Sequence, residues 1–248
     1  MDDVGARARA WFHGIHAEFC DRIERWEHGA VVRASRYPHY YDLNAVRVEE
    51  DPRMSVEELV AFADEALADA AHRRIDFEDV EAAEPLRGPF EALGWLTERL
   101  VWMRHDSALP PAPGVAVEEV SYDDVIDLRV NWHLEDFPNV DPGDYVAEAR
   151  DAAERRSARI LAVRDGGAAI AFAQLERHGG AAEISQVYVH PDHRGRGLGT
   201  AITCAAIHAG RDASDLWIIA DDEGRPKELY GRLGFRPAWH TTELTRLP

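Results

Sequence analysis

Lysine is almost missing from this chain of 248 residues: Lys227 is the only one, although lysine and arginine together number 28. We interpret the imbalance as a bias in genomic codon usage and attach no function to it. Cysteine is also scarce, since only Cys20 and Cys204 occur. Cys204 lies in an apolar segment, which indicates a buried free thiol rather than half of a disulfide.

Long apolar segments and a targeting signal are missing as well. No apolar run approaches the roughly 18 residues needed to span a bilayer, and residues 1–7 lack the basic start and apolar stretch of a signal peptide. These absences predict a cytoplasmic protein. The formal net charge is -18, so we expect neither nucleic acid nor a membrane as a partner. Such a surface attracts a cationic amine, although solubility alone also explains it.

Prolines and a glycine interrupt every hydrophobic period between residues 106 and 114, which is typical of a linker. The length of the chain suits two small domains. We therefore predict one domain over residues 1–105, a linker over 106–114 and a second domain over 115–248, in a monomer or a homodimer.

The C-terminal domain alternates helix and strand patterns. Ser121, followed by Asp124, indicates a helix start, and Gly210 and Gly234 indicate helix ends. We predict strands at residues 115–120, 159–164, 168–177, 181–189, 216–220 and from 235, with helices after Ser121 and at 144–156, 198–209 and 226–233. This order, β-α-α-β-β-β-α-β-α-β, predicts an α/β fold with a mixed, mostly antiparallel sheet flanked by helices.

The N-terminal domain partly repeats this order. Its expected elements are a helix carrying Trp11, Ile15, Phe19, Ile23 and Trp26, strands at 30–35, 43–48, 74–80 and 95–103, and helices at 55–71 and 84–93. Residues 89–95 also align with residues 229–235, because both end in leucine, glycine and an aromatic residue. We therefore predict two related domains in tandem.

The most informative segment runs from Val187 to Thr200, where a strand ends, glycines follow and a helix begins. Glycines allow the backbone to approach a ligand closely, and the free amides and dipole of a helix start attract an anion. Arg194 and Arg196 add positive charge within an acidic protein. The segment therefore predicts a turn that binds phosphate.

Two common phosphate motifs do not fit this turn. No Gly-Lys-Ser/Thr follows the glycines, which excludes a Walker A loop, and Thr200 stands where a dinucleotide fold needs a third glycine. What fits is Arg-x-x-Gly-x-Gly at Arg194, Gly197 and Gly199. With this motif the sequence resembles the GNAT superfamily of acyl-CoA N-acyltransferases. A glycine-rich connection with exposed arginines is the alternative.

The resemblance implies that the turn holds the pyrophosphate of acetyl-CoA, which would be the acyl donor. It also implies that the strand before the turn splays from its neighbour at a bulge and supplies the backbone donor for an oxyanion. The coenzyme contacts that it implies come from Val187, Tyr188, Val189, Arg194, Gly195, Arg196, Gly197, Leu198, Gly199 and Thr200.

Residues 228–235 resemble the closing motif of the family, in which a helix bearing a tyrosine, here Tyr230, is followed by Gly-Phe. The resemblance implies that Tyr230 protonates the departing thiolate; a tyrosine packed at a helix end is the alternative. Glu183 resembles the catalytic glutamate of some members and is our first candidate for the general base, with a solvated glutamate as the alternative. Strand alternation is expected to place Glu183, Ser185 and Val187 on one face.

By the same resemblance, an acceptor pocket forms beside the first two helices of the domain. We expect it to be lined by Trp132, His133, Asp136 and Phe137. Aromatic faces and a carboxylate suit a cationic amine, although a polar loop with buried aromatics also fits this segment. His190 and His193 flank Pro191-Asp192, but these ligands are too few for a typical site, and we predict no metal.

Some positions depart from the family. Glu223 replaces a frequent asparagine and Pro226 an alanine, which puts the expected coenzyme contacts of the last helix in doubt. In the N-terminal domain, the counterpart of the turn, residues 50–55, has no glycine, and Phe90 stands where Tyr230 stands in the other half. We therefore predict that the N-terminal domain is a degenerate copy that binds no coenzyme.

The resemblance thus predicts an N-acetyltransferase that transfers an acetyl group directly from acetyl-CoA to a primary amine of a small molecule or peptide. One alternative is a non-catalytic sensor, which would bind acyl-CoA without turnover. A second alternative is a pure interaction protein, which would not bind the coenzyme.

Overall fold

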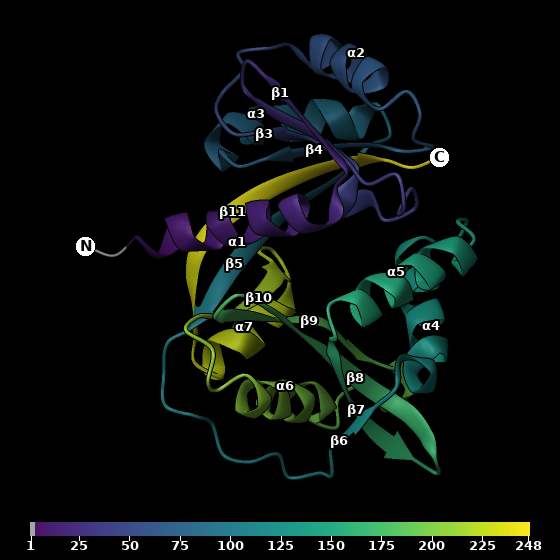
Figure 1. Ribbon diagram of the computed structural model, residues 1–248, viewed down its shortest axis with the longest axis vertical. Coiled ribbons are helices and arrows are strands. Elements are labelled where there is room, and N and C mark those ends of the chain that lie inside the picture. The colour runs from purple at the N-terminus through teal and green to yellow at the C-terminus, as the bar shows by residue number, and fades with distance from the viewer. Residues whose placement is uncertain (1–2) are drawn as a thin grey trace. The chain divides into compact units, whose positions relative to one another are not determined.

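The alternation of helices and strands predicted for the C-terminal half is present in the computed structural model, which describes residues 3–248 (Figure 1). The order β-α-α-β-β-β-α-β-α-β is confirmed, and short 3-10 turns are added at Tyr122–Val125 and Pro191–His193. The elements are β6 (Glu118–Val120), α4 (Ile126–Asp136), α5 (Gly143–Arg155), β7 (Arg159–Asp165), β8 (Ala168–His178), β9 (Ala181–Val189), α6 (Leu198–Ala209), β10 (Leu216–Asp221), α7 (Arg225–Arg232) and β11 (Phe235–Arg246).

The N-terminal half differs from the prediction near its start. Its elements are α1 (Val4–Phe19), β1 (Arg22–Trp26), β2 (Gly29–Arg33), β3 (Ala45–Val48), α2 (Val56–Ala66), β4 (Arg73–Phe77), α3 (Val80–Ala92) and β5 (Leu96–His105). The predicted helix through Ile23 and Trp26 is wrong beyond Phe19. Both residues belong to β1, because Trp26 pairs with Gly29 across a two-residue turn and the hairpin ladder competes successfully with helix continuation.

Contacts divide the chain into two units that interleave along the sequence. The first unit comprises Met1–Trp102, Asp221–Glu223 and Pro237–Pro248, and the second comprises Met103–Ala220 and Gly224–Arg236. The predicted second domain, residues 115–248, therefore differs from the second unit at its C-terminal end, because Pro237–Pro248 belongs to the first unit. The physical reason is strand pairing: β11 runs antiparallel to β4, from Thr242 opposite Phe77 to Arg246 opposite Arg73.

The predicted linker at residues 106–114 lies against the second unit. The Asp106 N–H donates to the Gly234 carbonyl at 3.0 Å, and the His208 Nε2 lies 2.9 Å from the Pro110 carbonyl oxygen. Backbone groups at two points of this segment are therefore hydrogen bonded, which restrains it along the surface of the unit.

Both halves contain the same succession of strand pairings, which supports the predicted repeat. In the first unit β1–β2 and β2–β3 are antiparallel and β3–β4 is parallel. In the second unit β7–β8 and β8–β9 are antiparallel and β9–β10 is parallel. The sheet is therefore mixed, and a helix joins each parallel pair, as a crossover between parallel strands requires.

The strands of the second unit are covered on both faces (Figure 1). On one face α4 places the Trp132 ring on the Tyr188 ring, with centroids 5.4 Å apart and an interplanar angle of 12°. On the other face lies α6, whose C-cap Gly210 leaves so little room that an added Cβ would stand 2.8 Å from Leu216 Cδ1 and 3.4 Å from Leu175 Cδ1. This layering fixes the end of β9 between two helices.

The sheet of the first unit has one apolar and one charged face. Apolar side chains of β3 and β4 pack on α2 and α3, and the charged side chains face α1. Arg74 pairs with Asp76 at 2.8 Å and with Glu243 at 2.5 Å, and Arg47 lies 3.1 Å from the His16 Nδ1. Burial, followed by the Arg47 charge, lowers the pKa of His16 to about 3. Burial also raises the pKa of Glu243, and the nearby Asp76 carboxylate adds to this effect.

Glu243→Gln is expected to reduce the dependence of stability on pH. Because the pKa of Glu243 is raised in the folded protein, its contribution to stability is complete below the ordinary glutamate pKa and is lost as pH rises through the raised value. Each tenfold difference in proton affinity corresponds to about 1.4 kcal/mol. Urea midpoints at about pH 5 and about pH 8 should therefore fall more for the wild type than for the variant.

The matched control for this experiment is Glu65→Gln, which removes the same charge from an exposed position of α2. Its midpoints should change with pH in parallel with those of the wild type. An equally steep pH dependence in Glu243→Gln and in the wild type would contradict the assignment.

Candidate active site

The strand β9 changes course at Gln186. This residue has a φ of 56°, in the left-handed region that L side chains rarely adopt. Opposite it the register shifts, because Gln174 pairs with Ser185 whereas Phe172 pairs with Tyr188. The strand therefore carries one extra residue, which is a β-bulge. The predicted bulge before the glycine-rich turn is present.

The parallel ladder between β9 and β10 ends where the bulge begins. It runs from Leu216 opposite Ala182 to Ile218 opposite Ile184, whereas β9 itself continues to Val189. The backbone of the last residues of β9 lies beyond this ladder. Amide groups there are free to donate to a ligand instead of to β10.

The bulge also changes which side chains of β9 point to the same face of the sheet. The side chains after the bulge therefore face the side opposite to the one that regular alternation predicts. Glu183 and Ser185 share a face with Tyr188, because their partners on β8 alternate regularly. Val187 and Val189 point to the opposite face, where an added Cβ on Gly199 of α6 would lie 3.9 Å from Val189 Cγ2. The predicted common face of Glu183, Ser185 and Val187 is therefore wrong, because the extra residue shifts the period.

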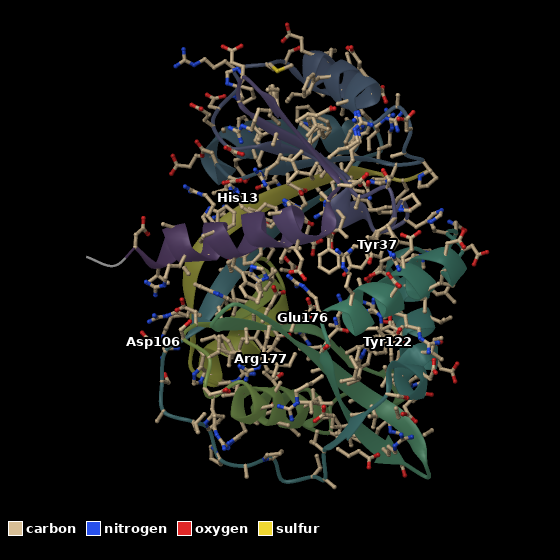
Figure 2. All side chains as sticks on the ribbon, in the orientation of Figure 1. His13, Tyr37, Asp106, Tyr122, Glu176 and Arg177 are labelled. Atoms are coloured by element: carbon tan, nitrogen blue, oxygen red, sulfur yellow. The ribbon has the colours of Figure 1, made fainter. Side chains whose placement is uncertain are left out.

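A buried arginine of α4 contacts the residue at the bulge. Arg129 of α4 is only 3% exposed, and its guanidinium donates to the Gln186 side-chain oxygen. It also donates to the Tyr122 hydroxyl and to the Tyr145 hydroxyl, each at 3.1 Å (Figure 2, where Tyr122 is labelled). Hydrogen bonds to a buried charge are stronger than neutral ones, so Arg129 restrains the residue at which β9 leaves its neighbour.

The glycine-rich turn leaves the start of α6 uncapped by any side chain. Gly197 is the N-cap with a φ of 78°, and Gly195 has a φ of 77°. The Ala201 N–H donates to the Gly197 carbonyl at 3.0 Å. The amides of residues 198–200 therefore precede the first hydrogen bond of the helix and point outward. An added Cβ at Gly195 or Gly197 would meet no atom within 4 Å, so the space beside the turn is open.

The corresponding turn of the first unit is closed by its own side chains. Ser55 caps α2: its hydroxyl accepts from the Glu58 N–H at 3.3 Å, and the Glu58 carboxylate accepts from the Ser55 N–H at 2.7 Å. Phe90, the counterpart of Tyr230, is fully buried in the apolar core. That the first unit binds no coenzyme stays a prediction, and these contacts are a physical reason to expect it.

A cavity of about 720 Å³ joins the turn, the end of β9, α4 and α7. Its walls therefore combine the outward amides of α6, aromatic rings and several charged groups. The lining residues are Trp132, Glu135, Asp136, Val187, Tyr188, Val189, Arg194, Gly195, Gly197, Leu198, Gly199, Thr200, Arg225, Pro226, Glu228, Leu229, Tyr230 and Arg232.

Most of the predicted site residues lie in this cavity, and four do not. Glu183 is buried on the α4 face before the bulge. Arg196 turns toward the preceding 3-10 turn, where it donates to the Asp192 carbonyl at 3.3 Å. His133 is buried, and its ring lies 5.4 Å from that of Phe137. The roles proposed for these four residues have no support from the cavity.

Tyr230 lies at the α7 wall of the cavity and is 6% exposed. Burial raises its pKa, so the phenol keeps its proton throughout the neutral range. Its ring packs edge-on against Phe235, with centroids 6.2 Å apart. The hydroxyl-bearing side chain is thus fixed and protonated, as a proton donor must be.

Two adjacent carboxylates of α4, Glu135 and Asp136, enter the cavity from the other side. Desolvation raises the pKa of Asp136, and Glu135 adds to this shift as a like charge. Glu135 is not among the acceptor-pocket residues that the sequence predicts, although it lines the cavity. Arg225 and Arg232 also line the cavity, and nothing in the sequence distinguished them from other surface arginines on a helix.

The Acetyltransferase (GNAT) family matches residues 127–235, which include the bulge, the turn and Tyr230. This segment belongs to the GNAT family. The matched segment ends at Phe235, the first residue of β11, and it contains every residue that lines the cavity.

Curated relatives match shorter stretches. An uncharacterized N-acetyltransferase of Methanocaldococcus jannaschii is 45% identical over 58 residues, which are 22% of this chain and 25% of that protein. The mycothiol acetyltransferase of Nocardiopsis dassonvillei is 41% identical over 69 residues, which are 27% of this chain and 21% of that protein. The chain thus spans about a quarter of the length of these relatives.

Solved structures match nearly the whole chain. A functionally unknown protein from Staphylococcus epidermidis has a TM-score of 0.65 at 15% identity, covering 92% of this chain and 94% of that one. A GCN5-related N-acetyltransferase from Kribbella flavida has a TM-score of 0.58 at 18% identity, covering 99% of this chain and 96% of that one. At these identities the likeness shows the fold.

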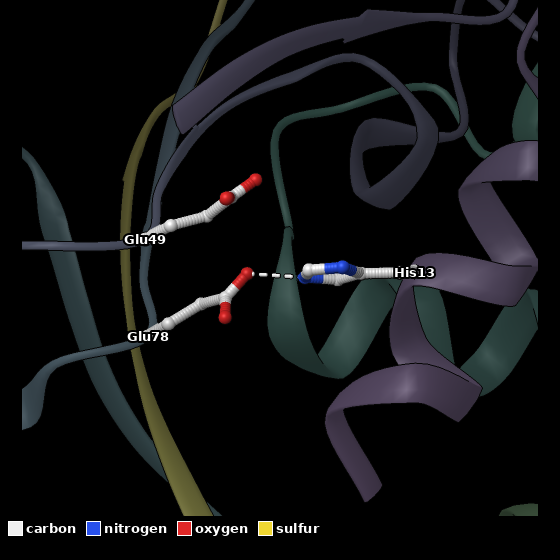
Figure 3. A group of neighbouring side chains, drawn as sticks. All are labelled: His13, Glu49 and Glu78. Carbon is white, nitrogen blue, oxygen red and sulfur yellow. Dashed lines mark hydrogen bonds and ion pairs between the residues drawn. The ribbon is translucent and has the colours of Figure 1, made fainter. Parts of the chain in front are cut away.

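One group of side chains outside the GNAT segment has the spacing of a metal site. The potential ligand atoms of His13, Glu49 and Glu78 lie within 4.8 Å of one another (Figure 3). His13 Nε2 is 2.5 Å from Glu78, Arg9 pairs with Glu78 at 3.0 Å, and Arg47 pairs with Glu49 at 2.8 Å. Guanidinium groups already neutralise both carboxylates, so the local charge disfavours a divalent cation.

Gly197→Ala is expected to weaken binding of inorganic pyrophosphate about tenfold, because a displaced amide loses a hydrogen bond to a charged group. The methyl group would be strained at a φ of 78°, at a cost of roughly 1 kcal/mol in folding stability. Isothermal titration calorimetry measures the first effect and thermal unfolding the second.

Gly88→Ala is the control for the effect of an added methyl. Gly88 lies within α3, and its added Cβ would meet no atom within 4 Å. It should not alter pyrophosphate binding. Unchanged pyrophosphate affinity in Gly197→Ala would show that the turn is not an anion site.

Proposed function

We propose that the second unit transfers an acetyl group from acetyl-CoA to a primary amine of a small molecule or peptide. The observation that carries the proposal is the single cavity into which the outward amides of α6, the splayed end of β9 and the protonated Tyr230 all open. A diphosphate suits the amides. An extended thioester arm suits the end of β9, where backbone groups lie beyond the ladder with β10.

The reaction proceeds by direct attack. The amine nitrogen attacks the thioester carbonyl carbon and forms the new C–N bond, and amides at the end of β9 hydrogen bond to the resulting oxyanion. Collapse of this intermediate breaks the C–S bond. The departing thiolate takes the proton of Tyr230, which regains one from solvent.

Asp136 is the group that accepts the proton of the attacking amine in this proposal. It lines the same cavity as Tyr230, and its raised pKa brings its basicity nearer to that of a useful general base. Glu183, the first candidate from the sequence, lies on the α4 face outside the cavity lining. The negative walls supplied by Glu135 and Asp136 favour a cationic acceptor.

Tyr230→Phe is expected to lower kcat about 100-fold, because the thiolate leaves without a proton donor. Its dissociation constant for acetyl-CoA should change little, since the hydroxyl acts on the leaving group. Thiol release with acetyl-CoA and an amine panel measures kcat, and calorimetry measures binding.

Tyr41→Phe removes a phenol hydroxyl from the first unit and serves as the matched control, with kcat unchanged. If acetyl-CoA binds but no amine supports turnover, the chain is a coenzyme sensor instead of an enzyme. If acetyl-CoA does not bind at all, the proposed function is wrong.

Asp136→Asn is expected to remove the acidic limb of the pH–rate profile. In the wild type kcat/KM should fall as pH drops through the raised pKa of Asp136, because the protonated acid no longer accepts a proton. The variant should be about 100-fold slower and lack this limb. Asp127→Asn, at an exposed position in the first turn of α4, should keep the wild-type profile. An unaltered profile in Asp136→Asn would exclude Asp136 as the base.

A further inference from the structure

Glu135 accepts two short hydrogen bonds from other residues that line the cavity. Its Oε1 accepts a hydrogen bond from the Tyr188 hydroxyl at 2.5 Å, and its Oε2 accepts one from the Arg194 guanidinium at 2.6 Å. Arg194 also donates through Nε to the Val189 carbonyl at 3.0 Å, and its guanidinium lies 5.6 Å from the centre of the Tyr188 ring. All four residues line the cavity.

These contacts keep Glu135 charged. Partial burial acts to raise its pKa, but the hydrogen bonds from Tyr188 and Arg194 outweigh this and hold the pKa below its ordinary value. The side chain of Glu135 is 35% exposed and that of Arg194 is 51% exposed. An ion pair with this much solvent exposure is weak and exchanges readily. A stronger anion can therefore replace the carboxylate on the guanidinium.

Arg194 directly precedes the turn whose amides face the cavity, so a diphosphate on those amides lies beside the same guanidinium. Two anions of this kind repel each other at short distance. We propose that Glu135 is an internal counter-ion that the diphosphate of the donor displaces from Arg194, and that the released carboxylate then holds the cationic acceptor. This inference rests on the proposed acyl-CoA site and adds to it a coupling between donor binding and acceptor binding.

The release links the two binding events thermodynamically. Before the donor binds, the negative charge of Glu135 is neutralised by Arg194 and offers little to an ammonium group. After the donor binds, the carboxylate retains the Tyr188 hydroxyl and lies next to Asp136, so that two negative groups face the acceptor. Donor and acceptor therefore strengthen each other's binding by the same factor. Glu135 is a positioning residue in this scheme, since it orients the acceptor and does not touch the reacting bonds.

The first test measures donor binding without any acceptor. Glu135→Gln should bind coenzyme A and inorganic pyrophosphate about fivefold more tightly than the wild type, because no carboxylate competes for Arg194. Pantetheine, which has no phosphate, should bind equally to both proteins. In an Arg194→Ala background the effect of Glu135→Gln should vanish, which a merely structural role of Glu135 would not predict.

Glu119→Gln is the matched control, because Glu119 forms an exposed ion pair with Arg159 at 2.9 Å outside the cavity lining. It should bind coenzyme A as the wild type does. Unchanged or weaker coenzyme A binding in Glu135→Gln overturns the displacement, and so does tightening that persists without Arg194. If the wild type binds no coenzyme A, the proposed function itself is wrong. This result is distinct from a failure of the displacement alone, in which the wild type still binds coenzyme A.

The second test asks whether the released carboxylate binds a cation. It measures the affinity of the protein for 1,4-diaminobutane with and without coenzyme A. The diamine should bind the coenzyme A-saturated wild type at least about fivefold more tightly than the free protein. In Glu135→Gln this gain should be lost. Equal affinity in the two states, or no binding in either, overturns the role of Glu135 as the acceptor's counter-ion.

Discussion

The contact between the buried Arg129 guanidinium and the Gln186 side chain is the constraint on which the site depends. It restrains the residue at which β9 acquires an extra position, and there the ladder with β10 ends. A regular strand would use its amides in the sheet and turn Val187 toward the α4 face. Because the bulge prevents both, backbone donors and the glycine-rich turn open into one cavity. A residue that does not line the cavity thus restrains the strand whose end does.

The two halves show how one repeat yields opposite properties at a helix start. In the second unit a left-handed Gly197 caps α6, which leaves the helix amides without a side-chain partner. In the first unit Ser55 and Glu58 satisfy the corresponding amides of α2. The difference lies in a few side chains and not in the order or sense of the strands. Whether the amides at the helix start are left open is therefore a property of the cap and not of the fold.

The sequence was sufficient for the features that local chemistry determines. Gly195, Gly197 and Gly199 after a strand indicated the turn, and the helix ending in Gly234-Phe235 located Tyr230. Partners distant in sequence could not be predicted. No local pattern reveals that Arg129 would reach Gln186, or that Glu135 would lie between Tyr188 and Arg194. For the same reason, the expected alternation across the bulge was wrong, and the pairing of β11 with β4 was not predicted. Which strands pair depends on contacts between distant parts of the chain, and the spacing of hydrophobic residues alone does not specify it.

The pairing of β11 with β4 has a consequence for how the chain is made. The ladder joins residues 242–246 to residues 73–77, so the two partners leave the ribosome at widely separated times. During synthesis the sheet edge at β4 waits without this partner while the whole GNAT segment emerges and begins to fold. Folding of the first unit is thereby tied to a contact of very high sequence separation, which slows its completion. Premature release of a nascent chain would leave the β4 edge unprotected and prone to association with other strands.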